Sequence, residues 1–135
     1  MKKCSCLIIM IFVWLIGCVT TPEKQMNVSD LIGKWHGPMT TSLYPETGHQ
    51  SSYRPTAELE IYNSELKGQI ILFLSSNVRQ SYPFHGQIKD NKLIAHWKGS
   101  RYMELELIKS RDSMRLDGKY DFIKVGGSIT LEKMP

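Results

Sequence analysis

Apolar and polar residues alternate from Leu31 to the end of the chain, and turn-forming residues interrupt the alternation at intervals of roughly eight to twelve positions. Successive side chains of a β-strand point to opposite faces of a sheet, so this period of two predicts short strands that each bury one face. Only residues 28–30 are expected to form a short helical turn, just before the first strand. The pattern therefore predicts an all-β domain of antiparallel strands.

The alternation divides into eight expected strands and two polar loops, 40–52 and 75–81. The strands are expected at 31–39, 53–62, 65–74, 82–89 and 92–98, then one ending near Lys109 and one carrying Met114, Leu116 and Tyr120. After a further loop over 121–126, the last expected strand carries Ile129 and Leu131. Eight strands with one apolar face favour a small antiparallel meander barrel, because closure removes the exposed edges. The interior of such a barrel is filled by side chains or holds one small ligand.

Two hairpin turns can be assigned from register. Asp90-Asn91 is a residue pair typical of a two-residue turn. In the next hairpin, a three-residue turn at 99–101 pairs Trp97 with Met103 and keeps the apolar side chains of both strands on the buried face. A two-residue turn would direct one of these apolar sets outward, so we expect the three-residue turn.

The first expected strand contains Gly33-Lys34-Trp35. A Gly-x-Trp at the start of an eight-stranded meander resembles the opening of lipocalins and avidins, the calycin barrels. The resemblance covers the architecture of the domain but only a handful of residues. The arginine that covers this tryptophan from the last strand of lipocalins has no assigned counterpart here, nor do the biotin contacts of avidins. The resemblance implies a calycin-like fold and a tendency to bind small apolar molecules.

Five glycines are expected to point into the barrel: Gly33, Gly68, Gly86, Gly118 and Gly127. Glycine weakens a strand, so five on one face require a cause. They could leave space for a ligand bounded by Trp35, Phe84, Trp97 and Tyr120. Alternatively, they let a small sheet curve and make room for those same rings, as small barrels alternate small and large interior residues.

On the outer face, the expected turns place His85 opposite His96 and His96 opposite Glu104. Two imidazoles and a carboxylate can bind a metal. The outer ligands would, however, have to lean inward over a convex surface whose strands are about 4.8 Å apart. We therefore expect a solvated histidine–glutamate pair and no metal.

No motif for catalysis occurs in the chain: it lacks Gly-x-Ser-x-Gly, His-Glu-x-x-His and a phosphate-binding loop. No close carboxylate pair is expected in the interior either. We expect no enzyme activity and no cofactor.

The N-terminal segment begins with Lys2 and Lys3, continues as an apolar run over 7–16 and ends in Leu15-Ile16-Gly17-Cys18. A basic start, an apolar middle and small residues before a cut are typical of a secretory signal. The last four residues resemble the lipobox of bacterial lipoproteins, in which the cysteine takes a diacylglycerol and a dedicated peptidase cuts before it. The alternative is an uncleaved transmembrane helix, but the run is shorter than the roughly 20 residues that a span requires.

The lipoprotein resemblance implies a signal helix at 1–17, a lipidated Cys18 with a flexible tether to residue 27, and a barrel domain over 28–135. It implies a lipid anchor in the cell envelope as the link to a membrane. Because Val19 and not Asp follows the cysteine, the resemblance favours the periplasmic face of the outer membrane in a cell with two membranes.

Cysteine usage and charge exclude several further functions. The three cysteines are Cys4, Cys6 and Cys18, so the domain has no thiol for catalysis, for metal binding or for an internal disulfide. The net charge of +4 includes Lys2 and Lys3 of the signal, and the other basic residues are scattered. We therefore expect no binding of nucleic acid.

Two hypotheses for function follow. The first is a membrane-anchored binding module for an apolar small molecule or lipid, which requires space near Trp35 and Trp97. The second is a packed barrel that binds another envelope protein, as an inhibitor or assembly factor, through the loops 40–52 and 75–81. Leu43, Tyr44 and Tyr53 would be the anchors of that surface.

Overall fold

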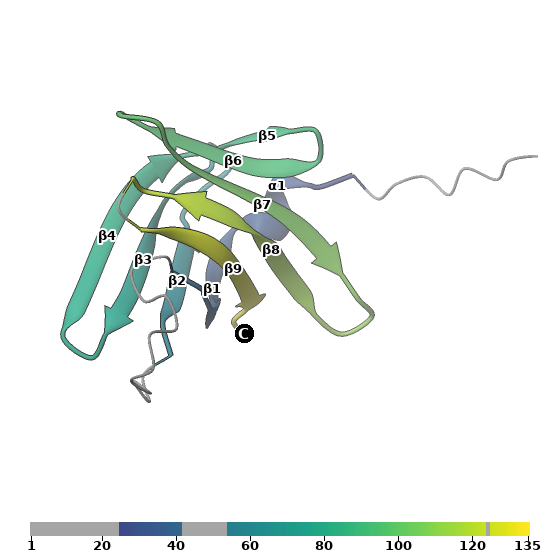
Figure 1. Cartoon of the computed structure of the whole chain (residues 1–135). Coiled ribbons are helices and arrows are strands. Elements are labelled where there is room, and N and C mark those ends of the chain that lie inside the picture. Colours follow the sequence, from purple (N-terminus) through teal and green to yellow (C-terminus); the bar gives the residue numbers. More distant parts are fainter. Residues whose placement is uncertain (1–24, 42–53, 124) are drawn as a thin grey trace, which may run out of the picture.

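The computed structural model describes residues 25–41, 54–123 and 125–135. Over these residues the protein consists of one short helix and nine strands (Figure 1). In chain order they are α1 (Val28–Leu31), β1 (Gly33–Pro38), β2 (Thr56–Ile61), β3 (Lys67–Ser75), β4 (Val78–His85), β5 (Gln87–Lys89), β6 (Lys92–Trp97), β7 (Arg101–Lys109), β8 (Met114–Asp121) and β9 (Gly126–Lys133). The expected all-β class is confirmed, as is the expected helical turn before the first strand.

The nine strands form one antiparallel sheet in the order β4-β3-β2-β1-β9-β8-β7-β6-β5. The first and last strands of the chain pair with each other, with Trp35 opposite Lys133. The sheet curls into a nearly closed barrel (Figure 1). Its two edge strands, β4 and β5, follow each other directly in the chain.

The expected strand 82–89 is in fact two strands that meet at Gly86. His85 pairs with Lys67 of β3, whereas Gln87 pairs with Ile94 of β6. The amide of Gly86 donates to the carbonyl oxygen of Leu66 at 2.9 Å. A Cβ at Gly86 would lie 2.8 Å from a methyl group of Leu93. The chain thus passes from one edge of the sheet to the other at a glycine, and the eight expected strands become nine.

The expected loop 75–81 is also wrong, because β3 and β4 form a tight hairpin there. Ser75 pairs with Val78, and only Ser76 and Asn77 lie between the strands. Residues 78–83 of β4 are exposed or half-buried on both faces. An edge strand of this kind lacks the apolar alternation by which strands are recognised in sequence.

One predicted hairpin turn is confirmed, and the other is displaced by one residue. At Asp90-Asn91 the two-residue turn is confirmed, with Lys89 opposite Lys92 and φ of 50° and 59° at the two turn residues. The next turn has three residues as expected, but they are 98–100, and Trp97 therefore pairs with Arg101 rather than with Met103. A shift of two residues leaves every side chain on its expected face.

Trp35 lies in the core and is fully buried. Its indole Nε1 donates to the carbonyl oxygen of Leu31 at 2.9 Å. The ammonium of Lys133, on the last strand, lies 5.4 Å from the centre of the Trp35 ring system. A lysine of the last strand therefore covers the indole of Trp35.

Two interior glycines allow neighbouring strands to approach closely. A Cβ at Gly68 would lie 2.1 Å from the carbonyl oxygen of Glu60, and one at Gly118 would lie 1.9 Å from that of Glu104. Both distances are far shorter than a van der Waals contact. At these two positions glycine is needed for the close approach of strands in a curved sheet, and not to leave space for a ligand.

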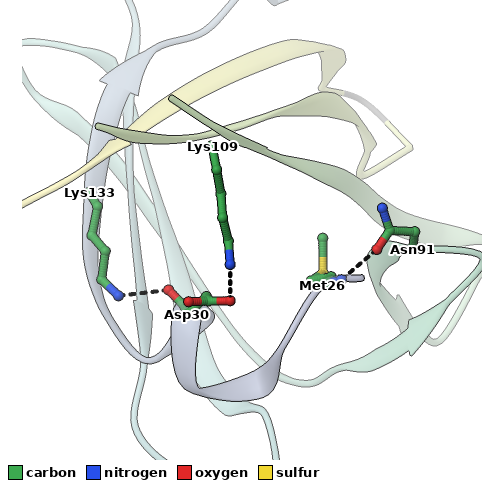
Figure 2. A network of polar contacts seen from close by, with 5 residues as sticks. All are labelled: Met26, Asp30, Asn91, Lys109 and Lys133. Carbon is green, nitrogen blue, oxygen red and sulfur yellow. Dashed lines mark hydrogen bonds and ion pairs between the residues drawn. The ribbon is translucent and has the colours of Figure 1, made fainter. Parts of the chain in front are cut away.

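Residues 26–31 cover one end of the barrel, here called the closed end (Figure 2). The amide of Met26 donates to Oδ1 of Asn91 at 2.6 Å. The Asp30 carboxylate forms an ion pair with Lys109, and the Asp30 carbonyl accepts a hydrogen bond from Lys133 at 2.6 Å. The turns β3–β4, β6–β7 and β8–β9 lie at the opposite end, here called the open end.

Candidate functional site

Five aromatic side chains gather near the open end and are here called the aromatic cluster: Tyr82, Phe84, Trp97, Tyr120 and Phe122. Phe122 is at the centre. Its ring stacks on Tyr82 at 4.3 Å between centroids, meets Trp97 edge-on at 5.0 Å and contacts Tyr120 at 5.3 Å. Such edge-on and stacked contacts add to the apolar area that the rings bury.

The aromatic cluster covers the seam between the strands at the two edges of the sheet. Tyr82 and Phe84 belong to β4, whereas Trp97 ends β6. The indole Nε1 of Trp97 donates to the carbonyl oxygen of Pro83 at 2.6 Å. Ring contacts and this one hydrogen bond thus connect β4 to β6 across a seam for which no strand pairing is found in the described sheet.

Three of the four residues expected to contact a ligand meet in this cluster. Trp97 contacts Phe84 at 6.2 Å, and Phe122 connects Trp97 to Tyr120. Trp35 is separate from them, since its indole is bonded to Leu31 beneath the closed end.

Phe122 and Tyr82 were missed in the sequence. Phe122 falls in the expected loop 121–126, yet its side chain is buried and its amide donates to Val125 at 2.8 Å. Its position directly after an apolar strand could have indicated that Phe122 is buried. Tyr82 precedes Phe84 by two positions, and this spacing places both on the inward face of β4.

The turn that carries Phe122 contains an unfavourable backbone conformation. Ile123 has φ of +74°, although it is β-branched, and its side chain is 60% exposed. Its amide donates to Oδ1 of Asp121 at 2.8 Å. Residues held in such conformations concentrate at binding sites.

A cation lies on the inner face beside the cluster. Arg101 begins β7 and is the cross-strand partner of Trp97, so the two side chains lie on the same face of the sheet. The Nε atom of Arg101 is buried and has no hydrogen-bond partner among the residues that the structure describes.

Tyr120 is held at the inner wall of the cluster by its phenol. Its hydroxyl donates to the carbonyl oxygen of Thr40 at 2.8 Å. Burial raises the pKa of Tyr120 to about 12. The group is therefore a neutral phenol at physiological pH and is unsuited to act as a base.

An open depression of about 410 Å³ lies next to this part of the barrel. Its lining includes Tyr102, Lys119, Asp121 and Ile123. Tyr120, Gly126 and Gly127 complete this lining.

The expected row of His85, His96 and Glu104 is wrong for two reasons: the strand breaks at Gly86, which separates His85 from β6, and the register at the β6–β7 turn differs from the expected one. His96 pairs with Tyr102, Glu104 pairs with Ile94, and His85 pairs with Lys67 of β3. Glu104 instead accepts a hydrogen bond from Lys92 at 2.6 Å, which lowers the pKa of the carboxyl. Within residues 25–41, 54–123 and 125–135, no three His, Cys, Asp or Glu side chains are placed to hold a metal ion.

Several predicted residues lie outside the described residues: Cys18, Leu43, Tyr44 and Tyr53. In the part of the chain with a described structure, no helix has the length and apolar character of a membrane span. No family model and no curated protein sequence matches the chain.

Proposed function

We propose that the domain is a binding module for an apolar small molecule or lipid, and that the aromatic cluster is its contact surface. The observation that carries this proposal is the gathering of five rings at the seam between β4 and β6. Aromatic side chains offer large, rigid apolar surfaces to a ligand, and barrel mouths are frequent ligand sites. Trp97 is only partly buried, so the surface can be reached from solvent.

The ligand competes with Phe122 for the same apolar surroundings. Trp97, Tyr82 and Tyr120 all contact the Phe122 ring. The positive φ of Ile123 lowers the stability of the turn that holds this ring in place. Displacing Phe122 would open a space bordered by the Tyr82, Trp97 and Tyr120 rings.

The test uses a neutral apolar dye, N-phenyl-1-naphthylamine, whose fluorescence rises in apolar surroundings. The described contacts all lie within residues 25–135, so a chain from residue 18 onward with Cys18→Ser keeps the whole described domain. We expect saturable binding that Trp97→Ala weakens about tenfold, in line with the loss of roughly 1.4 kcal/mol of aromatic contact. Tyr62→Ala, an exposed tyrosine directly after β2, is the matched control and should bind as the wild type does. A folded wild-type protein that gives no saturable signal would refute the proposal.

We further propose that the protein is an envelope lipoprotein anchored through Cys18 after removal of residues 1–17. The lipobox sequence and the polar residues 19–27 support this proposal. Met26, the first residue with described contacts, packs at the closed end, so an anchor at Cys18 would leave the open end facing away from the membrane. In a bacterial host, Cys18→Ser should abolish incorporation of labelled palmitate and release the protein from the membrane fraction. Continued labelling of that variant would contradict this proposal.

A second candidate function is binding of another envelope protein at the open end. Val78 and Ile123, both near that end, are apolar side chains with exposures of 41% and 60%. A photo-crosslinking residue at position 123 should then give one adduct of defined mass in the envelope, and the same residue at position 111, in the β7–β8 turn, should not. Equal crosslinking at the two positions would count against a specific partner.

A further inference from the structure

We infer that the ligand of the aromatic cluster is an anionic amphiphile, and that Arg101 binds its carboxylate or phosphate head group. This inference rests on the proposed function and adds to it the chemical class of the ligand. It follows from three features of Arg101: its place in the sheet, its lack of an anionic partner, and the donor geometry of its side chain.

The sheet register puts Arg101 beside the apolar surface. Arg101 is directly opposite Trp97 across the β6–β7 hairpin. Directly opposite residues have Cβ atoms about 4.5–5.5 Å apart on one face of the sheet. Trp97 in turn contacts Phe84 and Phe122, so the cation borders the rings. A ligand whose chain lies on these rings can therefore place its head group at Arg101.

Arg101 is distinguished among the described basic residues by a buried side-chain nitrogen without a hydrogen-bond partner. Five other basic residues form ion pairs with nearby carboxylates: Lys34, Lys67, Lys92, Lys109 and Arg115. In the described part of the chain, Arg101 forms no ion pair, and its buried Nε lacks an acceptor. A buried donor without an acceptor carries a desolvation cost, and each such group in a native protein calls for an explanation. An anionic ligand atom at this point would supply the missing acceptor.

The guanidinium group fits the head groups in question. Its N–H donors form a planar fork that matches two oxygens of a carboxylate or a phosphate. A neutral alcohol or ester cannot accept two charge-assisted hydrogen bonds in this way. Charged and neutral ligands with the same chain should therefore differ in affinity.

The test compares four probes on the chain from residue 18 with Cys18→Ser: decanoate, decyl phosphate, 1-decanol and inorganic phosphate. Binding is measured by calorimetry and by tryptophan fluorescence. One charge-assisted hydrogen bond corresponds to about tenfold in affinity or more. We expect decanoate or decyl phosphate to bind at least tenfold more tightly than 1-decanol, and inorganic phosphate alone not to saturate the site. The better of the two anions then identifies the head group.

Variants at Arg101 test the assignment of the residue. Arg101→Met keeps an apolar stem of similar length and removes the charge. It should reduce the affinity for the anionic probe to that for 1-decanol and leave 1-decanol unchanged. Arg79→Met is the matched control, because Arg79 lies over Phe73 on the outer face of the barrel. Unfolding midpoints in urea establish that each variant is folded.

The outcomes separate this inference from the proposed function. Equal affinities for decanoate, decyl phosphate and 1-decanol would overturn the inference and leave the proposed function intact. An equal loss of anionic and neutral probes in Arg101→Met would show that Arg101 only supports the apolar wall, and would also overturn it. Failure of all three amphiphiles and of the neutral dye would overturn both.

Discussion

The indole Nε1 of Trp97 donates a hydrogen bond to the carbonyl oxygen of Pro83 at 2.6 Å, from the end of β6 to the edge strand β4. Proline has no amide hydrogen with which to continue a ladder, and it is accepted in edge strands for that reason. Its carbonyl remains available, and Trp97 uses it. Within the described sheet, the seam between β4 and β6 is thus held by this hydrogen bond and by ring contacts rather than by paired backbones.

Trp97→Phe should reduce the free energy of unfolding by about 1 kcal/mol, the usual net contribution of one hydrogen bond. The phenyl ring retains the contacts with Phe84 and Phe122, so Trp97→Ala should cost more. Urea denaturation measures both. A Phe variant as stable as the wild type would mean that the bond to Pro83 contributes nothing.

Gly118→Ala should destabilise the domain by about 3 kcal/mol or prevent folding, as severe overpacking does. The new Cβ would lie 1.9 Å from the carbonyl oxygen of Glu104, and neither backbone can move without disrupting the β7–β8 pairing. Gly126→Ala is the control, because its nearest atom would be 3.3 Å away. Circular dichroism and thermal melting distinguish the two, and equal stability of the variants would be the contrary result.

The ion pair between Asp30 and Lys109 at the closed end should make stability depend on pH. The hydrogen bond from Lys109 holds the pKa of Asp30 below its ordinary value of 3.8. The unfolded chain then binds more protons than the folded one in this range, so stability rises with pH. The contribution is complete well above pH 3.8 and is lost as the pH falls through the lowered pKa. It is absent at lower pH, where both states are protonated.

Asp30→Asn tests this dependence. At pH 7 the variant should be less stable by about 1 kcal/mol, since the side chains of the pair are largely shielded from solvent. The difference from the wild type should shrink below about pH 4. Asp112→Asn, in the exposed β7–β8 turn, is the control and should track the wild type. A difference that does not change with pH would rule out this ion pair as its source.

Ile123→Asn should stabilise the protein by about 1 kcal/mol. A β-branched residue at φ of +74° is strained, and asparagine adopts this region at a lower cost. Little packing is lost, because the Ile123 side chain is mostly exposed. Ile108→Asn exchanges a similarly exposed isoleucine within β7 and should not stabilise. A lower melting temperature for Ile123→Asn would show that the isoleucine makes contacts worth more than the strain.

Local sequence rules predicted much of the fold. The period of two assigned the buried faces correctly, as the full burial of Leu59, Leu105 and Leu131 confirms. The pair Asp90-Asn91 predicted its turn, because few residues accept positive φ at both positions. These features depend only on residues adjacent in the chain, so they can be predicted from the sequence.

The candidate site depended on longer-range relationships. Phe84, Trp97 and Tyr120 were expected to face inward, but Phe122 and Arg101 could be placed beside them only once the barrel had closed. At the β6–β7 turn the strand pairing is shifted by two residues from the expected one. The alternation of apolar and polar residues cannot detect such a shift, because both registers bury the same side chains.

The sequence by itself determined the β class, the inward faces and the tight turn at Asp90-Asn91, since each follows from the chemistry of adjacent residues. Only the tertiary structure decided that the expected strand 82–89 is interrupted at Gly86 and that Phe122 lies at the centre of the aromatic cluster. It also decided that Arg101 lacks an anionic partner among the described residues. Those outcomes depend on which side chains compete for the same space between strands far apart in the chain. That competition exists only in the assembled barrel.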